Sequence, residues 1–105
     1  MNVDGLLKHH KALTTAALAT MAHKNHDYAG GKGESPFKNF TMASTLGLCS
    51  VEQGILVRMT DKLSRLVTYS EGEEAQVSDE SFDDTVVDLI NYTIILSAYR
   101  QTKGR

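Results

Sequence analysis

The sequence has little cysteine, little proline and few aromatic residues, and it has no tryptophan. Its one cysteine, Cys49, has no partner for a disulfide within the chain, which fits a reducing compartment such as the cytosol. One proline and eight glycines among 105 residues exclude a collagen-like or proline-rich chain. We therefore expect a fold that is held together by apolar packing alone.

Long hydrophobic runs are also absent. The longest mostly apolar stretch, Val86 to Leu96, is interrupted by Asp88 and Asn91 and is shorter than the roughly 20 apolar residues that cross a bilayer. Residues 1–5 lack the basic region that leads into the apolar core of a secretion signal. The expected location is cytoplasmic, with no membrane partner.

Positive charge is not in excess either, since the formal net charge is -2. The charges are unevenly distributed: residues 1–68 hold eight Lys and Arg against five Asp and Glu, and residues 69–105 hold three against eight. A duplex nucleic acid normally requires a clustered basic face and a high isoelectric point, so we do not expect such a partner. A small anion suits the basic first part of the chain better.

What the sequence does have is helical periodicity across most of its length. With 105 residues and 41% hydrophobic content, residues 1–105 fit one domain with one core. Apolar residues recur at spacings of three, four and seven, and no segment shows a sustained strand-like alternation, which favours an all-α fold. We predict a compact four-helix bundle with helices over about 4–24, 36–46, 50–69 and 78–100.

Capping signals mark several of the predicted helix ends. Ser50 and Gln53 form a capping box at the start of the third helix. Pro36 suits the first position of the second helix, because its missing N–H is not needed there, and Gly47 suits the end of that helix. The predicted cap of the fourth helix is Ser78.

The fourth predicted helix carries apolar residues around most of its circumference, so we expect it to be buried on nearly all sides. Three neighbouring helices in so short a chain do not cover such a surface, which predicts a homodimer or a homotetramer. One polar stripe interrupts the apolar surface and consists of Glu80, Asp84, Asp88 and Asn91. Buried carboxylates need a cation, a metal or water beside them.

The third predicted helix has a mixed but cationic ridge along one edge. The ridge consists of Arg58, Asp61, Lys62 and Arg65. When this ridge packs against the polar stripe of the fourth helix, the two form either a structural network of ion pairs or a site where cations bind phosphate. A metal site is a further alternative, because Asp61 could join Asp84 and Asp88 in offering oxygen ligands.

Residues 24–40 combine lysines, glycines, amides and aromatic rings in a predicted loop. This mixture suits a nucleotide. Lys24 and Lys38 could contact phosphates, and Tyr28 or Phe40 could stack on a base. The alternative is a flexible loop with Phe40 in the core.

Four motifs are the most distinctive part of the sequence. They are Asn-His-Asp-Tyr at 25–28, Pro-Phe-Lys-Asn-Phe at 36–40, Arg-Met-Thr-Asp-Lys-Leu-Ser-Arg at 58–65 and Glu-Ser-Phe-Asp-Asp-Thr-Val-Val-Asp-Leu-Ile-Asn-Tyr at 80–92. Together they resemble the phage-associated nucleotide-modification-associated domain family. More distantly, the layout is similar to the all-α, MazG-like nucleoside triphosphate pyrophosphohydrolases. Those enzymes hold magnesium with E-E-x-x-E on one helix and E-x-x-D on the next, whereas residues 61–65 here read Asp-Lys-Leu-Ser-Arg.

The resemblance implies a phage protein that binds a nucleotide. Because cations replace two acidic positions, we expect sequestration without turnover of a phosphate-bearing nucleotide, such as a cyclic dinucleotide immune signal, in the host cytosol. No catalytic residue and no cofactor are expected. The implied ligand-binding residues are Lys24, Asp27, Tyr28, Lys38, Asn39, Phe40, Arg58, Asp61, Lys62 and Arg65. The alternatives are a magnesium-dependent pyrophosphohydrolase, with Asp61, Asp84 and Asp88 as metal ligands, and a purely structural helical bundle.

Overall fold

The structure is a computed structural model that describes residues 1–28, 35–72 and 81–103, with the backbone alone for residues 25–28. Within these ranges it contains helices and no strand. The helices are α1 (Val3–Tyr28), α2 (Lys38–Thr45), α3 (Val51–Ser70) and α4 (Phe82–Thr102). The predicted all-α fold is confirmed.

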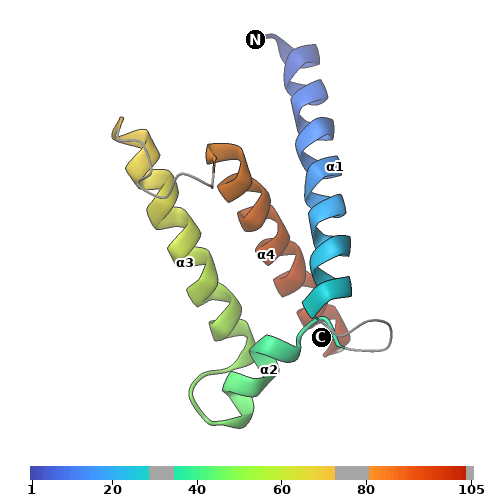
Figure 1. The fold of residues 1–105 in the computed structure, drawn as a ribbon, viewed down its shortest axis with the longest axis vertical. Helices are drawn as coiled ribbons and strands as arrows, with labels where there is room; N and C mark the ends of the chain where they lie inside the picture. Colours follow the sequence, from blue (N-terminus) through green and yellow to red (C-terminus); the bar gives the residue numbers. More distant parts are fainter. Residues whose placement is uncertain (29–34, 73–80, 104–105) are drawn as a thin grey trace.

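The helices form an open bundle in which α4 lies between α3 and α1 (Figure 1). The short helix α2 packs against α3, and among the described residues α1 and α3 do not pack against each other. The Cα radius of gyration is 15.6 Å, compared with about 13 Å for a globular domain of this length. The bundle is therefore less compact than the sequence predicts, because its two outer long helices, α1 and α3, do not pack against each other in the described ranges.

The core between these helices is small. In the part of the chain that the structure describes, the buried apolar side chains are Ala17, Val51, Ile55 and Val87. The prediction that α4 is buried on nearly all sides is wrong for the single chain, since Phe82 and Ile94 are about half exposed. The reason is geometric: α3 and α1 cover two flanks of α4 and leave the rest of its circumference open.

Two local signals that were read from the sequence are confirmed at the ends of α2 and α3. Ser50 Oγ accepts from the backbone N–H of Gln53, and Gln53 Oε1 accepts from the N–H of Ser50, both at 3.0 Å. Gly47 follows α2 with a φ of 80°, a left-handed conformation that favours glycine. Local sequence is enough here, because both features involve residues close along the chain.

Three predicted boundaries differ from the structure. α1 continues to Tyr28, so residues 25–28 are helical where a loop was predicted. Pro36 lies in the turn before α2, which begins at Lys38. α4 begins after Ser81, whose Oγ accepts from the N–H of Asp84 while Asp84 Oδ2 accepts from the N–H of Ser81. The predicted cap, Ser78, lies outside the described residues.

No helix in the described ranges is long and apolar enough to cross a membrane.

Candidate functional site

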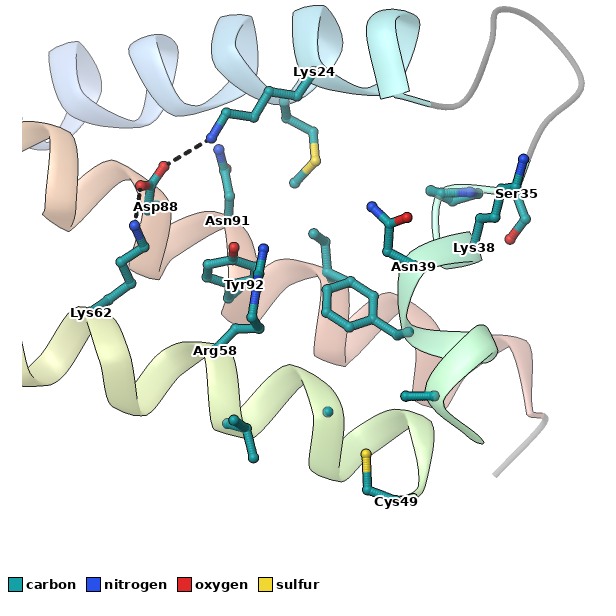
Figure 2. A pocket seen from close by; sticks show the side chains of 17 residues that line it. Lys24, Ser35, Lys38, Asn39, Cys49, Arg58, Lys62, Asp88, Asn91 and Tyr92 are labelled. Atoms are coloured by element: carbon teal, nitrogen blue, oxygen red, sulfur yellow. Dashed lines mark hydrogen bonds and ion pairs between the residues drawn. The ribbon is translucent and has the colours of Figure 1, made fainter. Parts of the chain in front are cut away.

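A cavity of about 720 Å³ lies between the helices, toward the end of the bundle that α2 occupies (Figure 2). All four helices contribute to its lining, together with the segments that flank α2. The lining residues are Met21, Lys24, Ser35, Pro36, Lys38, Asn39, Phe40, Ala43, Cys49, Gly54, Val57, Arg58, Lys62, Asp88, Asn91, Tyr92 and Ile95. The volume lies within the range of about 300 to 1,000 Å³ that is typical of small-molecule sites.

The charges that line this cavity are predominantly positive. Lys24 comes from α1, Lys38 from α2, and Arg58 and Lys62 from α3, whereas Asp88 on α4 is the one carboxylate among the lining residues that the structure describes. Three separate helices therefore direct cations toward the same space. Among these described residues four cations face a single carboxylate, an arrangement that attracts an anion.

Asp88 connects two of these cations at one end of the cavity (Figure 2). Its Oδ1 lies 3.2 Å from Lys24 Nζ, and its Oδ2 lies 2.9 Å from Lys62 Nζ. The side chains of Asp88 and Lys62 are only 15% and 13% exposed, while that of Lys24 is 46% exposed. Partial burial raises the pKa of Asp88, but the hydrogen bond from Lys62 and the positive charge of Lys24 outweigh it and hold the pKa below its usual value.

Aromatic rings line the middle of the cavity. The rings of Phe40 and Tyr92 lie edge to face, with centroids 6.4 Å apart and an interplanar angle of 83°. Both side chains are half-buried. Phe40 also packs against α3 at Gly54, where a Cβ would lie 3.8 Å from Phe40 Cδ1, an ordinary van der Waals distance. The cavity thus offers aromatic surface beside its cations.

Asn91 joins α4 to α1 next to the cavity. It is buried, and its Nδ2 donates to the backbone carbonyl oxygen of Ala17 at 3.0 Å. This hydrogen bond fixes the position of α1 relative to α4 beside the cavity.

The cavity contains six of the ten ligand-binding residues implied by the sequence. These six are Lys24, Lys38, Asn39, Phe40, Arg58 and Lys62. Asp61 and Arg65 do not line it, and they form an ion pair with each other along α3 at 3.6 Å. The side chains of Asp27 and Tyr28 lie outside what the structure describes, although their backbone belongs to α1.

The three predicted metal ligands are not brought together. Asp84 is exposed and caps α4, Asp61 pairs with Arg65, and Asp88 pairs with the two lysines. Within the described ranges, no group of three or more His, Cys, Asp or Glu side chains is arranged to hold a metal ion. Glu80, the first member of the polar stripe, lies outside those ranges.

Sequence reasoning did not assign Tyr92 or Asn91 to the ligand site. Tyr92 was counted among the apolar residues that cover most of the fourth helix, and Asn91 was placed in its polar stripe. The signal that could have found them is their spacing, since Asn91 and Tyr92 follow Asp88 by three and four residues and therefore share its face.

The chain was compared with models of known protein families, with curated protein sequences and with solved structures, and none of the three comparisons found a match. The resemblance described above therefore depends on the motifs alone, and the chemistry of the cavity has to be argued from its own residues.

Proposed function

We propose that this protein binds a phosphate-bearing nucleotide in the cavity and sequesters it without turnover. The observation that carries the proposal is the convergence of four cations from three helices on a space whose middle is lined by two aromatic rings. Phosphate oxygens form charge-assisted hydrogen bonds with lysine and arginine, and nucleobases pack on aromatic faces. Few small metabolites other than nucleotides combine both requirements.

The proposed ligand lies along the length of the cavity. One phosphate contacts Arg58 and the two lysines that flank Asp88, and the base packs near Phe40 and Tyr92. Lys38 lies toward the other end, near Ser35 and Asn39 (Figure 2). A ligand with two separated phosphates, such as a cyclic dinucleotide, contacts cations at both ends, which is why we propose this class as the sequestered signal.

The finer parts of the proposal follow from the sequence motifs. We propose a phage protein that acts in the host cytosol by removing a nucleotide immune signal, and that works as a homodimer or homotetramer. A magnesium-dependent pyrophosphohydrolase is the second reading of the same motifs, but no contact among the described residues favours it over simple binding.

Calorimetry with purified protein tests the proposed function. The titrants are nucleoside mono-, di- and triphosphates and cyclic dinucleotides, each with and without magnesium. We expect at least one of these ligands to bind with a dissociation constant in the micromolar range or below, with or without magnesium. Absence of heat and of any thermal shift with every titrant would overturn the proposal.

A further inference from the structure

The side of α1 that packs against α4 continues beyond the end of its partner. Leu13 and Ala17 lie on this side, where Ala17 is buried and accepts the hydrogen bond from Asn91. Leu6 and Val3 continue the same stripe toward the N-terminus, at spacings of seven and three. Figure 1 shows that the first turns of α1 extend past the start of α4. The apolar stripe of α1 is therefore longer than the surface of α4 against which it packs.

We call residues 3–12 the α1 arm. All of its residues are exposed except Gly5, which is half-buried. Its apolar side chains are among the most exposed in the chain, at 69% for Val3, 56% for Leu6 and 60% for Leu7. Isolated helical segments shorter than about 12 residues are marginal in water, and most helical stability comes from packing of an apolar face. Among the described residues no surface covers the apolar side chains of the arm, and a partner surface would stabilise it.

The exposed area of the whole chain leads to the same conclusion. Its accessible surface is 7667 Å² for a mass of 11.5 kDa. A compact monomer of this mass exposes about 5,800 Å². The surplus exceeds the roughly 800 Å² that each partner contributes to a stable protein interface of standard size. The surplus is therefore large enough to include one partner's share of a standard interface.

The charges of the arm point to a second copy as that chain. Asp4 and Lys11 are seven residues apart and therefore lie on the same edge of the arm, beside the apolar stripe. Among the described residues neither forms an ion pair. When two identical helices pack antiparallel about a two-fold axis, matching edges meet, and each residue contacts its counterpart reciprocally. An axis between Leu7 and Lys8 brings Asp4 of each copy opposite Lys11 of the other.

We propose that two copies of this chain associate through their α1 arms, which pack antiparallel with Val3, Leu6 and Leu7 in the apolar contact and reciprocal Asp4–Lys11 pairs at its edge. This proposal identifies the face that the expected oligomer uses, and it does not depend on which ligand the cavity binds. A parallel arrangement about a two-fold axis places the two Asp4–Lys11 edges on opposite sides of the interface and loses both ion pairs, so the antiparallel orientation is the favoured one.

Sedimentation velocity on the full chain tests the proposal. The wild type is expected to be a dimer or a multiple of a dimer at micromolar concentration. Leu6→Asp is expected to weaken that association by about tenfold or more, because it places charge in an apolar contact. The matched control is Leu48→Asp, which changes an exposed leucine far from the arm, before α3, and is expected to leave the association unchanged. Circular dichroism checks that both variants keep most of the helical content of the wild type.

A charge exchange tests the orientation separately. Asp4→Lys and Lys11→Asp are each expected to weaken the dimer, and the double variant is expected to recover most of the loss because the reciprocal pairs are restored. A wild type that stays monomeric at all concentrations, or a Leu6→Asp variant that associates as the wild type does, overturns the proposal. A double variant that is no better than either single one overturns the antiparallel orientation.

Discussion

Asp88 on α4 and Lys62 on α3 form an ion pair of 2.9 Å between Oδ2 and Nζ, and both side chains are largely withdrawn from water. Lys24 on α1 approaches the other oxygen of the same carboxylate at 3.2 Å. A single carboxylate on the central helix thus connects the two outer helices, α1 and α3, which do not otherwise pack against each other in the described ranges. The same three residues form one end of the candidate site, so their contacts affect both stability and binding.

The first prediction concerns the pH dependence of stability. The pKa of Asp88 is held below its usual value of 3.8 in the folded chain, so the unfolded chain binds the proton more readily. The stability contributed by this carboxylate is therefore fully present above about pH 4 and is lost as the pH falls through the lowered pKa. Urea unfolding from pH 2 to pH 6 should show a steeper acid loss for the wild type than for Asp88→Asn. Parallel pH curves for the two proteins would contradict this assignment.

The second prediction concerns the junction between α1 and α4. Asn91→Ala removes the hydrogen bond to the carbonyl oxygen of Ala17 and leaves a small void at a buried position. We expect the free energy of unfolding to fall by about 1 to 2 kcal/mol. Thr93→Ala is the matched control, because Thr93 is exposed on the same helix and bonds only to carbonyls of its own helix. Equal effects of the two changes would argue against the proposed role of Asn91.

The third prediction distinguishes a ligand site in the cavity from a ligand site on the cationic ridge along α3. Arg58 lines the cavity, whereas Arg65 is paired with Asp61 outside it. A charge-assisted hydrogen bond to phosphate contributes about 1.5 to 3 kcal/mol, so Arg58→Ala should weaken nucleotide binding roughly tenfold to a hundredfold. Arg65→Ala should change the affinity little. Calorimetry on the wild type and both variants measures the difference, and a larger loss in Arg65→Ala would place the site on the ridge.

The fourth prediction is that bound nucleotide is not turned over. The carboxylates that a magnesium-dependent pyrophosphohydrolase would need at this position are separated, with Asp84 capping α4 and Asp61 paired along α3. Incubation with magnesium and nucleoside triphosphates should release no pyrophosphate above the background of the uncatalysed reaction. Release at an enzymatic rate that disappears in Asp88→Ala would favour the hydrolase instead.

Much of the helical framework could be read from the sequence because its signals are local. The capping box of Ser50 and Gln53 requires only residues three positions apart, and the left-handed turn at Gly47 requires only a residue without a Cβ. The two candidate caps of α4 differ in one respect: Ser81 has an acidic residue, Asp84, three positions later, whereas Ser78 has Ser81 there. Asp84 then serves as the cap partner of Ser81, which removes it from the predicted acidic site.

The candidate site could be predicted only in part. Periodicity correctly places Arg58 and Lys62 near each other on one helix, because their spacing of four residues decides that by itself. It also extends the same edge to Arg65, although the structure leaves that residue outside the cavity. A helical edge is longer than the cavity that it borders, and only the position of α2 and α1 shows where the cavity ends.

The sequence by itself determined the all-α class, the capping box of α3 and the cationic character of one edge of that helix, because each depends on residues within a few positions of one another. Only the tertiary structure decided that Asp88 pairs with Lys24, 64 residues away, as well as with Lys62. Periodicity shows which side of a helix a residue occupies, but it contains no information about which helix lies opposite. That choice depends on how α1 and α3 pack against α4, and it decides whether a carboxylate is held between lysines or left open for a metal ion.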